Sequence, residues 1–205
     1  MKKYGLKLMW AVMAATLLLS VGAHAEIVKI LIMGDTQKVT DQQPQIFLDT
    51  MDDILTDPVT SDAAFILNMG DMTEDSKTSC WDVAQQGWRK LDDKMFYVYN
   101  FGNNDFMNSG TAKCRNYFPL NYYNNNSSVQ MFSDAYMSQY DTGLNMAFHY
   151  EAGGVDWLII SVKDSPGSGE ADWAASVMAA HPDKRVIVVS HDNLTGDDDV
   201  YQKAK

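Results

Sequence analysis

The sequence has little positive charge. It contains 16 Lys and Arg residues against 27 Asp and Glu residues, which gives a formal net charge of −11 at pH 7. A surface this acidic disfavours nucleic acids and anionic membranes as partners, because it repels their phosphate groups. It suits a protein that holds divalent cations, since carboxylates are ligands for hard cations.

Cysteine is also scarce. The two cysteines, Cys80 and Cys114, lie far apart in the chain and form no CxxC pattern. This spacing disfavours a cysteine-ligated metal site. In an oxidising compartment an even pair is most simply a disulfide. We therefore expect a Cys80–Cys114 disulfide if the chain is exported.

The N-terminal segment indicates export. Residues 1–25 begin with lysines at positions 2, 3 and 7, continue with an apolar stretch and end on Ala-His-Ala. This arrangement is typical of a secretory signal, with small residues where a signal peptidase reads the chain. The alternative, a membrane anchor, is disfavoured because the apolar run is short and the cleavage site is good. The sequence thus predicts cleavage before Glu26 and a periplasmic or secreted protein without membrane attachment.

Strand and helix patterns alternate through the first half of the remaining chain. Apolar runs at 27–33, 63–71 and 95–105 predict buried strands, and residues 42–57 and 80–94 carry apolar side chains at helical spacing. This β-α-β-α-β order implies parallel strands with crossover helices. The sequence therefore predicts one α/β domain that begins at residue 26 and runs to residue 205.

The second half shows a different order. Residues 106–143 contain a polar, turn-prone stretch without strong periodicity, which predicts a long excursion over the active face. Residues 144–162 predict a hairpin that turns at a Gly-Gly pair. Residues 169–184 predict a short helix, and residues 185–191 predict a last buried strand that ends at a histidine. We find no internal repeats.

Polar side chains follow the predicted strands at the points where they end. Three apolar runs end in Gly34-Asp35, Gly70-Asp71 and Gly102-Asn103, and a fourth ends at His191. Ligands bind at the carboxyl ends of strands in open α/β sheets, and glycine lets the backbone turn tightly there. Taken alone, each ending has a simpler explanation as an ordinary turn or a structural histidine. Together on one sheet edge, two carboxylates, an amide and an imidazole predict a site for one or two divalent metals.

The four motifs resemble those of the calcineurin-like metallophosphoesterases. They read Gly34-Asp35-Thr36-Gln37, Gly70-Asp71-Met72-Thr73-Glu74, Gly102-Asn103-Asn104-Asp105 and Ser190-His191, and the resemblance covers about residues 27 to 195. It implies a four-layer αββα sandwich with two divalent metal ions, such as Mn, Fe or Zn, at the strand ends. It also implies hydrolysis of phosphate mono- or diesters, with a small phosphorylated molecule as the substrate.

The resemblance implies a role for each metal-site residue. Asp35 would bind the first metal, and Asp71 would bridge both, because its two oxygens accept independently. Asn103 and His191 would bind the second metal. Gln37 stands where many members of the family have a metal-binding histidine, so it is expected to bind the first metal or to support its ligands. Two cations held in this way can clamp a phosphate and activate a bound water.

Two departures from the family pattern affect the expected activity. Asn104 replaces the histidine that is thought to protonate the leaving group or steady the transition state, and loss of a general acid typically costs about 10²–10⁴-fold in rate. Asp105 keeps its place beside it, so Asn104 and Asp105 are the candidate catalytic residues of this loop. The family's closing Gly-His-x-His motif is missing, since the remaining histidines after position 25 are His149 and His181. We therefore expect a domain that is incomplete at its C-terminal end and impaired in hydrolysis.

Two other functions fit part of the pattern. One is a non-catalytic metal- or phosphate-binding remnant of such an enzyme, which metal content and hydrolysis of an activated aryl phosphate would distinguish. The other is a phospho-aspartate enzyme or receiver with Asp35 as the acceptor. Export and the lack of a D-x-D pattern at 35–37 count against the second.

Overall fold

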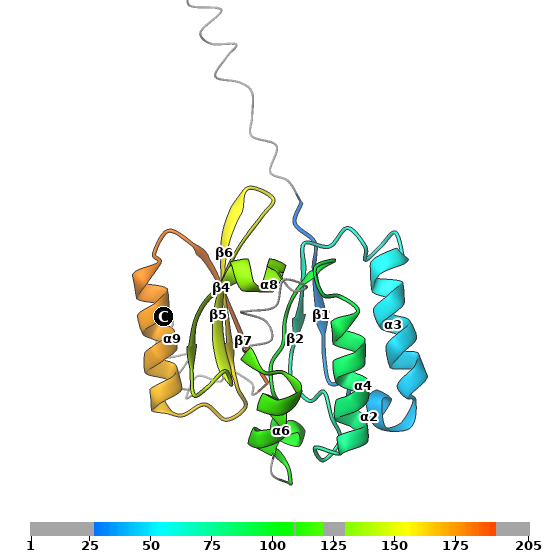
Figure 1. Cartoon of the computed structure of the whole chain (residues 1–205). Coiled ribbons are helices and arrows are strands. Elements are labelled where there is room, and N and C mark those ends of the chain that lie inside the picture. Colours follow the sequence, from blue (N-terminus) through cyan, green and yellow to red (C-terminus); the bar gives the residue numbers. More distant parts are fainter. Residues whose placement is uncertain (1–26, 109, 121–129, 192–205) are drawn as a thin grey trace, which may run out of the picture.

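The computed structural model of the protein describes residues 27–108, 110–120 and 130–191 (Figure 1). The predicted signal peptide and its cleavage site lie outside these residues. Among the described helices, none combines the length and the apolar character needed to cross a membrane.

Three parallel strands form the first sheet. They pair in the order β1-β2-β3, and helices connect them, so the predicted β-α-β-α-β unit is confirmed. The predicted helix at 42–57 is confirmed as α3, which begins at Pro44, where the missing N–H costs nothing, and an additional short helix, α2, precedes it. The elements are β1 (Ile30–Met33), α2 (Gln37–Gln42), α3 (Pro44–Thr56), β2 (Phe65–Asn68), α4 (Thr78–Arg89) and β3 (Phe96–Val98).

The second sheet has four strands in the order β4-β5-β6-β7. β5 pairs antiparallel with β4 and β6, and β7 pairs parallel with β6. The predicted hairpin is confirmed as β5 and β6, which turn at Gly153 and Gly154 with φ values of 59° and 67° that suit glycine. The elements are β4 (Tyr136–Tyr140), β5 (Asn145–Ala152), β6 (Val155–Val162), α9 (Ser168–Ala180) and β7 (Arg185–Ser190).

The segment predicted as a long excursion contains regular structure where it is described. It holds α6 (Gly110–Tyr117), α8 (Gln130–Ala135) and the edge strand β4, and α5 (Asn103–Phe106) immediately precedes it, at the end of the run predicted as a strand and its loop. These elements are short, so little apolar periodicity marks them in the sequence. The polar stretch at 121–128 lies outside the described residues.

The two sheets pack against each other, with helices on the outer sides. Figure 1 shows α9 beside the four-stranded sheet and α3 and α4 beside the three-stranded sheet. Aromatic side chains join the sheets: Phe96 of β3 stacks on Tyr150 of β5 with ring centroids 4.4 Å apart, and Phe65 of β2 contacts Trp157 of β6. A second apolar cluster joins β5 and β6 to α9. The protein is therefore a mixed α/β protein, as the sequence predicts.

The strand ends do not share one sheet edge, which corrects the sequence-based expectation. β1, β2 and β3 belong to one sheet, whereas β7, which ends at His191, belongs to the other. The local pattern of a strand does not specify its partner, so this could not be seen in the sequence. The ends still meet, because the Nδ1 atom of His191 lies 2.9 Å from the carbonyl oxygen of Met69, just after β2.

Cys80 and Cys114 are unpaired in the structure, contrary to the expected disulfide. Both thiols are buried, on α4 and α6 respectively, and they face different groups. The Sγ atom of Cys80 lies 3.7 Å from Asp41 Oδ1, and that of Cys114 lies 3.8 Å from the carbonyl oxygen of Asp105. An even cysteine count carries no information on this geometry.

Candidate metal-binding site

Asp71 lies at the centre of the strand-end cluster. It is buried, and its φ of 51° places it in the left-handed region that residues other than glycine rarely adopt. Aspartate tolerates this conformation better than most residues, but it still has a cost. Such conformations persist where the surrounding structure holds them.

The three strand-end glycines have different roles. Gly70 has a φ of 97°, and a Cβ there would lie 2.8 Å from His191 Nδ1. A Cβ on Gly102 would lie 2.2 Å from Asp71 Oδ1, so this glycine allows a close approach. At Gly34, by contrast, an added Cβ meets no described atom within 4 Å. The predicted tight turn therefore applies to Gly70, whereas the structure requires no glycine at position 34.

Asn104 contacts both oxygens of the Asp71 carboxylate. Its backbone N–H donates to Oδ1 and its side-chain Nδ2 donates to Oδ2, each at 2.8 Å. These two hydrogen bonds fix the plane of the carboxylate. An ionised carboxylate offers about four acceptor positions, so each oxygen can still take another partner.

His191 reaches this carboxylate from the second sheet. Its Nδ1 lies beside the Met69 carbonyl, which can only accept, so Nδ1 carries a hydrogen. Its Nε2 lies 3.1 Å from Asn103 Oδ1 and 3.6 Å from Asp71 Oδ2. Burial opposes a charge on the ring, but the Met69 carbonyl and the nearby carboxylates of Asp71 and Asp35 outweigh it and raise the pKa of His191.

The atoms that meet at Nε2 are all acceptors. With Nδ1 protonated, a neutral His191 presents a lone pair to Asn103 Oδ1 and Asp71 Oδ2, and neither oxygen carries a hydrogen. A positive charge between these three acceptor atoms stabilises the arrangement. This charge can be a proton on Nε2 or a bound cation. A carboxylate oxygen, an amide oxygen and an imidazole nitrogen are ligands that divalent metals accept, so the donor set fits a metal.

Asp35 follows β1 and lies near His191, and Gln37 begins α2 two residues later. The Asp35 side chain is 58% exposed, and its Oδ1 lies 3.9 Å from His191 Nδ1. The Oε1 atom of Gln37 is buried and has no hydrogen-bond partner among the described residues. A buried acceptor without a partner is unusual and fits an atom that binds a ligand or water. The backbone N–H of Thr36 donates to the Asp71 carbonyl at 3.0 Å and joins the two loops.

Asp105 holds the backbone that surrounds the cluster. Its Oδ1 accepts from the N–H and the hydroxyl of Thr73, and its Oδ2 accepts from the N–H of Met72 and of Gly102. Burial raises the pKa of Asp105 to about 6, although these hydrogen bonds act in the opposite direction. The carboxylate is fully buried, so its contacts assign it to positioning rather than to contact with a substrate.

Two residues of the site were not among the sequence-based candidates. Thr73 lies within the second motif, so its position was a usable signal. Met69 contributes only a backbone carbonyl, and no side-chain pattern can indicate that. Within the described part of the chain, no group of three or more His, Cys, Asp or Glu side chains is arranged to hold a metal. The cluster described above depends on the amide of Asn103 as one of its donors.

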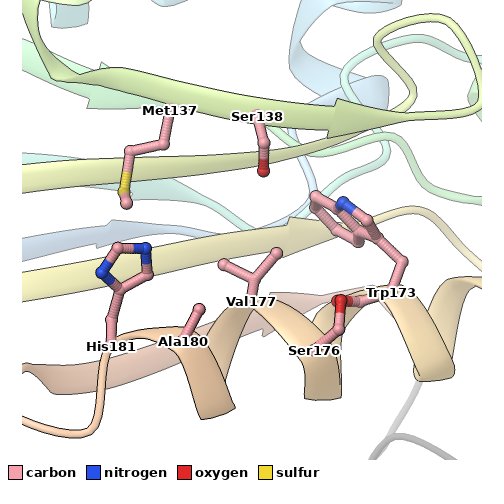
Figure 2. Close-up of a pocket in the computed structure, with 7 residues that line it drawn as sticks. All are labelled: Met137, Ser138, Trp173, Ser176, Val177, Ala180 and His181. Carbon is pink, nitrogen blue, oxygen red and sulfur yellow. The ribbon is translucent and has the colours of Figure 1, made fainter.

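A separate pocket of about 320 Å³ lies between β4 and α9. Figure 2 shows its lining side chains facing each other from these two elements. It is mainly apolar and shares no residue with the strand-end cluster. Its lining residues are Met137, Ser138, Trp173, Ser176, Val177, Ala180 and His181.

No family model and no curated protein matches the chain.

Proposed function

We propose that this protein is a metal-dependent phosphoesterase of the calcineurin-like type, with its metal site at the ends of β1, β2, β3 and β7. The observation that carries the proposal is the group of acceptors formed by Asp71, Asn103 and His191. The sheets packed between outer helices agree with the αββα sandwich that the sequence resemblance implies (Figure 1).

In this proposal Asp71, Asn103 and His191 hold divalent cations, and Asp35 after β1 and Gln37 at the start of α2 complete the site. Bound cations would polarise a phosphate ester and supply an activated water. Asn103 provides a neutral oxygen, which limits the negative charge that faces an anionic substrate. The His191 hydrogen bond to Met69 fixes the ring so that Nε2 faces the site. The substrate class is a small phosphate mono- or diester, and export would place the reaction in the periplasm or outside the cell.

The decisive experiment is a calorimetric titration of the metal-free protein with Mn²⁺. Turnover of an aryl phosphate monoester and of a diester is measured in parallel. The wild type should bind Mn²⁺. The Asp71→Asn variant should bind it at least about tenfold more weakly, because a carboxylate oxygen is replaced by a neutral amide. Asp53→Asn, an exposed change on α3, is the matched control and should bind as the wild type does.

Two results would overturn the proposal: a wild type that binds no divalent metal, or an Asp71→Asn variant whose binding is unchanged. Binding without hydrolysis would favour the second candidate, a non-catalytic metal-binding protein. One observation supports that candidate, since the Asn104 amide is engaged with Asp71 and offers no acidic proton to a leaving group.

A further inference from the structure

We propose that Asn104 is a positioning residue that fixes the Asp71 carboxylate in the orientation in which it receives a cation. This inference rests on the proposed function and deepens it. The sequence pattern assigns position 104 to the leaving group of the substrate. The structure instead points its amide at the central carboxylate of the site.

The backbone conformation of Asp71 and its contacts with Gly102 and Asn104 leave its side chain little freedom. Its backbone is held in the left-handed region at a φ of 51°. The backbone of Gly102 lies so close that an added Cβ would be 2.2 Å from Oδ1. Asn104 then donates to Oδ1 from its backbone and to Oδ2 from its side chain. One donor on each oxygen prevents rotation of the carboxylate about its own axis.

An asparagine is well suited to this role. Its amide N–H₂ is a donor at every pH, whereas a neutral imidazole carries a hydrogen on only one of its two nitrogens. The amide is also neutral, so it orients the carboxylate without cancelling the charge that attracts a cation. Groups that orient metal ligands are worth about 10–100-fold in metal affinity, because the ligands are already placed before the metal arrives.

The first test uses Mn²⁺ affinity and turnover together. Asn104→Ala should raise the Mn²⁺ dissociation constant about 10–100-fold. Its turnover should return close to the wild-type value at saturating Mn²⁺, since the amide acts through Asp71. Asn104→Gln keeps an amide but displaces it by one methylene, so it should also bind Mn²⁺ more weakly. An unchanged dissociation constant with reduced turnover at saturating Mn²⁺ would place Asn104 at the leaving group and overturn the inference.

The matched control is Asn108→Gly. Asn108 lies near Asn104 in the chain and donates from its side chain to the Asp75 carbonyl at 3.1 Å, away from Asp71. Its φ of 48° suits glycine. This variant should leave the Mn²⁺ dissociation constant unchanged. A loss of affinity equal to that of Asn104→Ala would show a general effect of the loop and contradict the inference.

The second test needs no metal and separates the two proposals. A double-mutant cycle of Asn104→Ala and Asp71→Asn is measured by denaturant unfolding of the metal-free protein. The effects should be clearly non-additive, because both changes disrupt the same hydrogen bond. Additive effects would overturn the positioning role. If the wild type binds no divalent metal but the cycle shows coupling, the proposed function is wrong. The hydrogen bond between Asn104 and Asp71 is then still confirmed.

Discussion

Asp105 connects the segment after β2 to the segment after β3, beside the hydrogen bonds between Asn104 and Asp71. It accepts hydrogen bonds from Met72 and Thr73 after β2 and from Gly102 after β3. The loop after β2 carries Asp71, and α5, which follows β3, begins with Asn103 and Asn104. One buried carboxylate thus sets the distance between residues on which the proposed site depends.

Replacement of Asp105 by asparagine should destabilise the protein. The asparagine N–H₂ group would face backbone N–H donors, so buried donors would lose their acceptor, at a cost of about 1–3 kcal/mol or more in the free energy of unfolding. Denaturant unfolding measures this. Asp49→Asn, an exposed change on α3 next to Gln45, is the control and should alter stability by less than about 0.5 kcal/mol. Equal stability of the two variants would contradict the role given to Asp105.

Gly102 and Gly34 offer a second comparison of matched substitutions. Gly102→Ala should lower the free energy of unfolding by about 1–3 kcal/mol, because the added methyl group overlaps with Asp71 and forces a backbone shift. It should also weaken Mn²⁺ binding. Gly34→Ala should be close to neutral in thermal unfolding and in Mn²⁺ titration. If the two variants behave alike, the close approach at Gly102 is not needed.

At the scale of helices and strands, the two cysteines belong to different environments. Cys80 lies on α4 and Cys114 on α6, and both are buried and unpaired. Burial raises the pKa of the Cys114 thiol well above its usual range, which suppresses the reactive thiolate.

We therefore expect both thiols to be unreactive in the folded protein. Ellman's reagent should detect almost no thiol under native conditions and both thiols after denaturation without a reductant. Rapid labelling of native Cys114 would contradict its burial. Absence of any thiol after denaturation would show that the cysteines pair in the exported protein.

The sequence predicts strongly apolar elements and misses helices with few apolar side chains. β1, β2, β3 and the β5–β6 hairpin follow from apolar runs and turn residues, because burial requires those patterns. The short helices α5, α6 and α8 have too few turns to show a period. The pairing of β7 with β6 rather than with the first sheet also escapes prediction, since strand partners depend on contacts far apart in the chain.

In the candidate site, too, the sequence reveals some features and not others. The motifs locate Asp35, Asp71, Asn103 and His191 because side-chain type and strand ends are visible in a sequence. The role proposed for Asn104 is not visible in the sequence, because it is inferred from a φ of 51° at Asp71 and from two distances of 2.8 Å. Its position in the motif alone assigns Asn104 to the leaving group of the substrate.

At the scale of the whole molecule, the proposed site depends on how the two sheets pack. Asp71 and Asn103 follow strands of the first sheet, and His191 follows a strand of the second. Aromatic side chains fill the space between the sheets, and Phe96 contacts both Phe148 and Tyr150 there. The position of His191 relative to Asp71 is therefore set by this packing.

Phe96→Ala should affect stability and metal binding together. Loss of the buried ring should lower the free energy of unfolding by about 3–5 kcal/mol. The remaining folded protein should bind Mn²⁺ more weakly, because the sheets lose a contact that fixes their separation. Val186→Ala on β7, where the side chain is 41% exposed, is the control and should change both quantities little. Mn²⁺ affinity equal to the wild type in folded Phe96→Ala would show that the site is set by its loops alone.

The contact between Met69 and His191 spans 122 residues of sequence, and this separation has a consequence for the order of events during synthesis. The chain emerges from its N-terminal end, so β1, β2, β3 and the loop with Asn104 exist before β7 is made. The Asp71 carboxylate can thus be oriented early, whereas its imidazole neighbour arrives last. Contacts between distant segments form slowly, because a long loop must close first. Until β7 is made, the nascent chain therefore contains the acidic residues of the site and lacks its histidine.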